Sequence, residues 1–252
     1  MIKNWQSEAF VLWTKPYGEA DKLVVLFTRR KGKVAAVARG ARKAKSKLAG
    51  IVDMFVTGDY LLYQGKSLAI IRQAALLAEY SRLRESFEHY SHGVYLCELV
   101  NQVLEEACPA EALYDLMLMA FKALNRADSD PVLITRGFEL LLLKELGYSP
   151  YLKGCLACGA TAPPFIFSPA AGGLLCCRCS AGNKGTKGIA LSQGSIALMK
   201  RILDRGLAGI GSLKAPAKVQ DELNRLLWES ITCNTGISGL KSKALLNYTW
   251  RG

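Results

Sequence analysis

Four of the eight cysteines occur in two pairs that have the spacing of metal ligands. Cys155 and Cys158 form the first C-x₂-C pair, and after 17 further residues Cys176 and Cys179 form the second. Two residues between paired cysteines let one tight turn aim both sulfurs at the same point, and a tetrahedral set of thiolates selects zinc. Four protein ligands leave no open position for a substrate, so we predict a structural Zn²⁺ site.

The other cysteines leave alternatives open. Cys177 adjoins the second pair, but only Cys176 with Cys179 keeps the two-residue spacer. Four cysteines could also hold an iron–sulfur cluster or pack as small apolar residues; the paired spacing favours zinc, and nothing in the sequence points to redox chemistry. Three further cysteines lie in apolar stretches of helical pattern and are expected to be packing residues: Cys97, Cys108 and Cys233.

A dense run of positive charge is the second feature with chemical meaning. Residues 29–47, the basic run, contain nine Lys and Arg and no Asp or Glu. Such a run repels itself unless an anion binds, and cations bind nucleic-acid phosphates by releasing counterions. Residues 39–47 have no apolar residue larger than Ala, so we expect a mobile loop. Six side chains of the run are predicted to contact DNA phosphates: Lys33, Arg39, Arg42, Lys43, Lys45 and Lys47.

The distribution of charge also favours a polyanionic partner. The 252-residue chain has a formal net charge of +12. Residues 1–78 hold 14 Lys and Arg against 5 Asp and Glu, whereas residues 79–149 hold 6 against 12. An uneven field of this kind concentrates polyanions at one face. Five aromatic residues are candidates for stacking on unpaired bases, with core packing as the alternative for each: Trp13, Tyr17, Phe27, Phe55 and Tyr60.

The elements that must position these residues change character near residue 78. Segments rich in Val, Ile, Leu, Phe and Tyr, separated by turn signals, predict five strands, at 7–13, 22–28, 33–38, 54–63 and 68–75. Five strands in fewer than 80 residues predict a small closed barrel, because closure removes exposed sheet edges. We prefer an OB-fold, although an SH3-like barrel would leave much the same pattern.

Beyond residue 78 the apolar residues recur with helical spacing. Helices are expected at about 79–108, 110–127 and 131–146, and again at 194–207, 218–232 and 240–247. Asp130 can cap the third, Pro131 suits its first turn, and Gly147 fits just past its end. The predicted fold is therefore α+β and multidomain. An OB-fold domain at 1–78 precedes an α-helical domain at 79–252, which carries a four-cysteine zinc-binding loop at about 150–188.

Several classes of enzyme lack their motifs in this chain. No Gly-x₄-Gly-Lys-Ser/Thr loop for ATP, Gly-x-Ser-x-Gly elbow or zinc-deaminase pattern occurs. The two histidines, His89 and His92, are expected at the surface or partly buried on a helix. We see no signal peptide and no apolar run near the ~20 residues of a membrane span. We therefore expect a cytoplasmic protein that is not an enzyme and has no membrane partner.

Short motifs also follow one another in a characteristic order. They are GEADK at 18–22, FT at 27–28, GK at 32–33, ARGAR at 38–42 and KSK at 45–47, then RGFEL at 136–140, LGYSP at 146–150 and GGLLC at 172–176. Together they resemble the RecO family of bacterial DNA-repair and recombination mediators. The resemblance covers most of the chain and fades after about residue 190. Some members lack the cysteines, and the doubled Cys176-Cys177 departs from the family pattern.

The resemblance implies an OB-fold, a helical domain and a zinc-binding loop in a protein of the bacterial nucleoid. It implies ATP-independent binding of single- and double-stranded DNA, annealing of complementary strands and, with RecR and RecF, help in loading RecA onto DNA coated by single-strand-binding protein. The C-terminal tail of that coating protein would fit a basic rim at Arg136, Lys200 or Arg201. The alternatives are an RNA-binding zinc module of translation or ribosome assembly, and a zinc hydrolase or nuclease, which the lack of histidine and carboxylate ligands disfavours.

Overall fold

The computed structural model describes residues 4–181, 188–211 and 213–249. The chain divides into two compact units: unit 1 is drawn from Met1–Asn125 and Leu240–Gly252, and unit 2 from Arg126–Gly239. Within the described residues, no helix is both long and apolar enough to cross a membrane.

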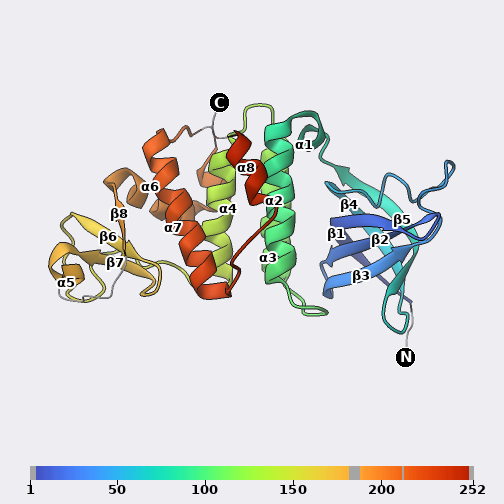
Figure 1. Ribbon diagram of the computed structural model, residues 1–252, viewed down its shortest axis with the longest axis horizontal. Coiled ribbons are helices and arrows are strands. Elements are labelled where there is room, and N and C mark those ends of the chain that lie inside the picture. Colours follow the sequence, from blue (N-terminus) through green and yellow to red (C-terminus); the bar gives the residue numbers. More distant parts are fainter. Residues whose placement is uncertain (1–3, 182–187, 212, 250–252) are drawn as a thin grey trace. The chain divides into compact units, whose positions relative to one another are not determined.

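Unit 1 begins with five strands that close into a barrel (Figure 1). They are β1 (Asn4–Tyr17), β2 (Asp21–Thr28), β3 (Gly32–Ala38), β4 (Val56–Tyr63) and β5 (Ala69–Glu79). Their hydrogen-bonding order is β1-β2-β3-β5-β4, and β4 pairs with β1 to close the barrel. Only β3 and β5 pair in parallel. This order is that of an OB-fold, so the preferred prediction is confirmed and the SH3-like alternative is excluded.

The barrel interior is filled by alternate strand residues, as the period of two requires. Val24 and Leu26 on β2 and Tyr60 and Leu62 on β4 are fully buried in one apolar cluster. The observed β1 and β5 extend beyond their predicted ends. The residues added to β1 include Asn4, Gln6, Thr14 and Lys15, and an apolar pattern does not mark such polar residues as part of a strand.

The barrel is accompanied by helices in unit 1, and one of them packs aromatic rings against it. They are α1 (Arg82–Glu85), α2 (Phe87–Val103), α3 (Glu111–Leu124) and α8 (Lys243–Thr249). The Phe10 ring of β1 has its centre 4.9 Å from that of Tyr114 and 5.3 Å from that of Phe121, both on α3. This aromatic packing explains why the compact unit continues to Asn125 although the barrel strands end at Glu79. The division into domains at residue 78 stays a prediction.

Unit 2 combines helices with a small sheet (Figure 1). Its elements are α4 (Pro131–Glu145), β6 (Phe165–Ser168), β7 (Gly173–Cys176), α5 (Cys177–Ala181), β8 (Ile189–Leu191), α6 (Gln193–Arg205), the 3₁₀ helix η1 (Gly206–Gly209) and α7 (Ala217–Thr235). The predicted ends of α4 are confirmed: Asp130 accepts a hydrogen bond from the Leu133 N–H, and Gly147 follows with φ +87°. The sheet, in the order β7-β6-β8, was not predicted, because its strands have only three or four residues.

Candidate metal centre and nucleic-acid interface

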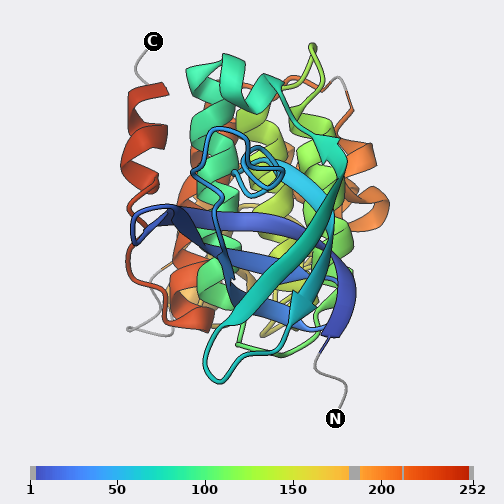
Figure 2. The same ribbon diagram turned by 90° about the vertical axis from the view of Figure 1, so that its right-hand side faces the viewer.

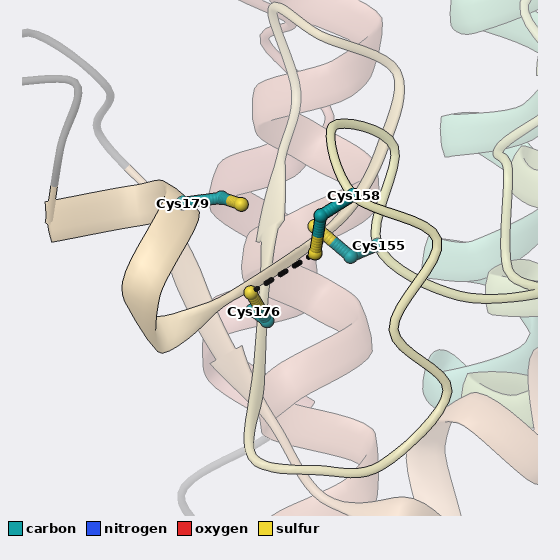
Figure 3. A group of neighbouring side chains, drawn as sticks. All are labelled: Cys155, Cys158, Cys176 and Cys179. Atoms are coloured by element: carbon teal, nitrogen blue, oxygen red, sulfur yellow. Dashed lines mark hydrogen bonds between the residues drawn. The ribbon is translucent and has the colours of Figure 1, made fainter.

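The four paired cysteines meet in unit 2 (Figure 3). The sulfurs of Cys155, Cys158, Cys176 and Cys179 all lie within 4.8 Å of one another. Those of Cys158 and Cys176 are 3.7 Å apart. A tetrahedron with zinc–sulfur bonds of ~2.3 Å has an edge of ~3.8 Å, so the cluster has the dimensions of a four-thiolate site.

Each half of the cluster has its own local structure. In the first half, the Gly159 N–H donates to the Cys155 carbonyl at 2.9 Å, and Gly159 adopts a φ of +73°, which favours glycine. In the second half, β7 ends at Cys176 and α5 begins at the next residue. The Leu156 N–H donates to the carbonyl of Leu174 on β7 at 2.8 Å and joins the two halves.

Hydrogen bonding prepares two of the sulfurs to be thiolates. The Cys176 backbone N–H, with those of Cys158 and Ala157, lowers the pKa of the Cys155 thiol to about 6. The Cys179 N–H likewise lowers the pKa of Cys176, whereas the neighbouring sulfurs raise the pKa of Cys179 to about 12. Because crowded thiolates repel, a divalent cation at the centre would stabilise all four in the ionised form. Zinc bound here would supply a fixed crosslink.

The remaining cysteines lie outside this cluster. Of the adjacent Cys176 and Cys177, it is Cys176 that belongs to the four-sulfur cluster, and Cys177 is exposed outside it. Cys97 is buried, as expected of a packing residue. The same expectation is wrong for Cys108 and Cys233, which are both exposed. Cys108 follows the end of α2, and Cys233 lies on the exposed side of α7. The apolar content of a segment does not show which of its positions are exposed.

The basic run ends in a loop between β3 and β4, residues 39–55, that is tied to the barrel. The Gly40 N–H donates to the Asp21 carboxylate at 2.7 Å, and the Tyr60 hydroxyl donates to the Ile51 carbonyl at 2.6 Å. Val52 is fully buried. The segment is therefore a series of anchored turns and not a freely projecting loop. The sequence pattern missed these anchors because their partners lie on the strands.

The predicted phosphate contacts fall into two groups. Lys33 is half-buried on β3, and its ammonium donates to the Asn101 carbonyl on α2 at 2.9 Å. The other five are exposed on the β3–β4 loop: Arg39, Arg42, Lys43, Lys45 and Lys47. Contact of all six with DNA stays a prediction.

Arg29, at the start of the basic run, has partners within the protein. Its guanidinium lies 3.3 Å from the Glu8 carboxylate, 3.6 Å from that of Glu111 and 2.5 Å from that of Asp115. It also lies 4.7 Å from the centre of the Tyr114 ring. Arg29 thus connects α3 to the barrel, and the count of nine cations overstates the charge that the run offers to a ligand.

Two tandem family models match the chain. The model described as Recombination protein O N terminal matches residues 1–80, and the one described as Recombination protein O C terminal matches residues 84–244. The chain belongs to the RecO family. This confirms the resemblance found in the motifs, and it makes the chain a DNA-repair protein of that family.

Individual relatives of this RecO-family chain agree with the models. DNA repair protein RecO of Symbiobacterium thermophilum is 34% identical over 244 residues, which cover 95% of each chain. The protein of the same name from Syntrophomonas wolfei is 36% identical over 222 residues, covering 88% of each chain. That of Exiguobacterium sibiricum is 38% identical over 173 residues, covering 69% of each chain.

Two expectations about polar residues of the RecO-family chain need correction. His89 and His92 both lie on α2 and are only 6% and 2% exposed, so they are buried and not surface residues. Arg136 is not on an open rim: its guanidinium donates to the Asn224 side chain at 2.7 Å and lies 2.8 Å from the Glu139 carboxylate. Asn224 is far from Arg136 in the sequence, and the burial of Glu139 on the same helix depends on tertiary packing, so composition does not reveal either contact.

The structure also sorts the aromatic candidates of this RecO-family chain. Phe27, Phe55 and Tyr60 are core residues. Trp13 is 38% exposed and Tyr17 is 47% exposed, both on β1. The Lys15 ammonium lies 5.3 Å from the centre of the Trp13 ring. The sequence prediction overlooked Lys15, although positions two apart on a strand share a face.

Proposed function

We propose that this chain is a recombination mediator. It binds single- and double-stranded DNA, anneals complementary strands without ATP and helps to load RecA onto DNA coated by single-strand-binding protein. The observation that carries the proposal is the set of five exposed cations within residues 39–47, on one loop of an OB-fold in a RecO-family chain. A protein with this task works at the nucleoid in the bacterial cytoplasm.

Annealing requires positive charge because it brings two polyanions together. Lys and Arg side chains offset phosphate repulsion by releasing counterions, with little dependence on base sequence. The anchors at Gly40 and Ile51 hold the loop on the barrel while its cations face solvent. No covalent bond of DNA changes in this process, so the proposed role is not enzymatic.

Zinc and partner proteins belong to unit 2 in this proposal. Structural zinc would join the turn at Cys155 to the end of β7 and hold a segment too short to form its own core. RecR, RecF and the tail of single-strand-binding protein are the proposed partners. Of the basic residues predicted for the tail, Lys200 and Arg201 on α6 are exposed and retain that role as a proposal.

The deciding experiment measures annealing of complementary strands precoated with single-strand-binding protein, with no nucleotide added. The wild-type protein should anneal them. The triple variant Lys43→Glu, Lys45→Glu, Lys47→Glu should lose annealing while its circular dichroism and thermal unfolding stay unchanged, because these side chains are exposed. A wild-type protein that fails to anneal would refute the proposal, and so would a triple variant that binds DNA normally at moderate salt.

A matched variant controls for the change in net charge. Lys144, Lys153 and Lys214 are exposed in unit 2, and replacing all three by Glu changes the net charge equally. This variant should anneal like the wild type.

Binding of single-stranded DNA and RNA of equal length provides a further comparison. A strong preference for RNA would favour the RNA-binding alternative.

A further inference from the structure

Unit 1 contains a cavity that neither the metal centre nor the β3–β4 loop accounts for. It measures about 600 Å³, within the usual range for small-molecule sites. The outer surface of the barrel supplies one wall, with Leu12, Trp13 and Val25. α2 and the C-terminal segment supply the others, and Met54 at the end of the β3–β4 loop also lines the cavity. Figure 2 shows the β1–β2 hairpin and α8 on the same side of this unit.

The barrel wall has the properties of a stacking surface. Trp13 presents a large aromatic side chain that is 38% exposed, beside apolar neighbours. Other large aromatic side chains of the barrel are fully buried, including Phe27 and Tyr60. Aromatic side chains that remain accessible next to cations are where proteins stack the bases of single-stranded nucleic acids. Lys15 supplies such a cation beside the ring.

The α2 wall is polar but unsuited to phosphate. Asn101 and Gln102 line the cavity, and neither side-chain amide has a hydrogen-bond partner among the described residues. Amide groups of this kind match the donor and acceptor edges of bases. Glu98 lines the cavity as well, and its carboxylate is held by the N–H groups of Lys241 and Ser242 at 3.0 and 2.8 Å. A negative charge there repels phosphate and leaves a neutral base as the better occupant.

Positive charge at the edge of the cavity fits the phosphate backbone that would carry such a base. Lys15 lies beside Trp13, and Lys241 is exposed at the opposite wall. Lys33 donates to the backbone of Asn101, so the basic run reaches the same helix that lines the cavity.

We propose that this cavity accepts one unstacked nucleobase of single-stranded DNA. Trp13 is its stacking surface, and the amides of Asn101 and Gln102 contact the base edge. The inference rests on the proposed DNA binding and adds a base-dependent contact to the phosphate contacts of the β3–β4 loop.

The test compares two oligonucleotides of equal length, oligo(dT) and an abasic strand with the same number of phosphates. Binding is measured by fluorescence anisotropy. Trp13→Ala should weaken binding of oligo(dT) about 5- to 150-fold, the range expected for loss of one stacked base. It should leave binding of the abasic strand within about 2-fold, since phosphate contacts persist. Trp13→Phe keeps an aromatic ring and should restore most of the affinity.

Phe87→Ala is the matched control. Phe87 is an exposed aromatic residue at the start of α2, outside the cavity, and its replacement should change neither affinity. Equal effects of Trp13→Ala on both strands, or none on either, would overturn the proposal. If Trp13→Ala is unfolded by circular dichroism, Gln102→Ala decides. Gln102 is exposed, and its replacement must weaken oligo(dT) binding alone. A wild-type protein that binds neither strand would instead refute the proposed function.

Discussion

Backbone N–H groups act together with cysteine spacing at the candidate metal centre. The spacing brings sulfurs together in pairs, whereas hydrogen bonds from the chain lower the pKa of Cys155 and Cys176. Thiolates are the form that binds metal, so part of the cost of deprotonation is already met by the fold. At this scale the protein resembles a preformed ligand set more than four independent side chains.

Replacing Cys158 by Ser should therefore remove the metal. Purified wild-type protein should contain about one zinc per chain, and the variant close to none, because three thiolates hold zinc far less well than four. Hydrogen exchange should rise across residues 151–181, while the barrel strands stay protected. Cys177→Ser is the control, since Cys177 is exposed and outside the cluster. Equal zinc loss in both variants, measured by elemental analysis, would contradict the assignment.

Single residues differ in how far the sequence predicts them. The cysteine site was predictable because its geometry follows from ligands close together in the chain. The surroundings of His89, Arg29 and Arg136 were not, because burial and ion pairing depend on segments far apart in sequence. Charge counts in particular cannot tell a cation that binds a ligand from one that joins two elements.

At the scale of elements, β3 depends on the segment that follows α2. β3 pairs with β5 at only two positions, Ala36 and Val37. Nearer its start, the Ala107 N–H donates to the Lys33 carbonyl at 3.1 Å. The segment after α2 thereby covers part of a strand edge that would otherwise be open.

Gly32→Ala tests this contact. Gly32 has a φ of +65°, and an added Cβ would lie 1.8 Å from the Cys108 carbonyl oxygen. We expect a loss of about 2–4 kcal/mol of unfolding free energy, from backbone strain together with overpacking. Gly18→Ala is the control, because Gly18 has a φ of +59° with open space around it, and should lose only about 1 kcal/mol. Equal urea midpoints for the two variants would contradict the close approach of the Cys108 carbonyl to Gly32.

Glu98 makes attachment of α8 depend on pH. Burial opposes ionisation of Glu98, but hydrogen bonds from Ser242 and Lys241 outweigh it and lower its pKa. A carboxyl whose pKa is lower in the folded state stabilises that state above its unfolded pKa of ~4.3, and the stabilisation is lost as the pH falls through the folded value. Attachment should therefore be complete at neutral pH and weaken in acid.

Glu98→Gln should remove about 1–2 kcal/mol of unfolding free energy at neutral pH, the usual size for charged hydrogen bonds that are partly exposed. The difference from wild type should shrink as the pH falls below ~4, since the wild-type carboxyl then becomes neutral too. Urea unfolding across this pH range measures the difference in unfolding free energy between the two proteins. Hydrogen exchange of the backbone amides of residues 240–249 should be faster in the variant. A difference that is independent of pH would show that the charge of Glu98 is not what holds α8.

Helices whose ends are marked by nearby residues were predicted more accurately than the grouping of helices and strands into two compact units. Asp130, Pro131 and Gly147 marked both ends of α4, because caps act within one turn. The extent of unit 1 follows instead from rings on β1 and α3 that are about 100 residues apart along the chain. No local pattern encodes such contacts.

Considered as a whole molecule, the chain uses its uneven charge for two purposes. Acidic residues of α3 pair with Arg29 and stabilise unit 1. The cations of the β3–β4 loop remain exposed and keep their charge for a ligand. Net charge alone therefore predicts the sign of the ligand, and the structure is needed to say which cations it meets.

Salt dependence measures how many cations the DNA meets. Each phosphate neutralised on a single strand contributes about −0.7 to the slope of log affinity against log salt concentration. If the five exposed loop cations each contact one phosphate, the slope should be about −3.5, and the triple variant Lys43→Glu, Lys45→Glu, Lys47→Glu should flatten it by about 2. The variant in which Lys144, Lys153 and Lys214 become Glu should keep the wild-type slope. If the triple loop variant keeps the wild-type slope, the DNA phosphates must contact another part of the protein, even if the variant binds DNA more weakly.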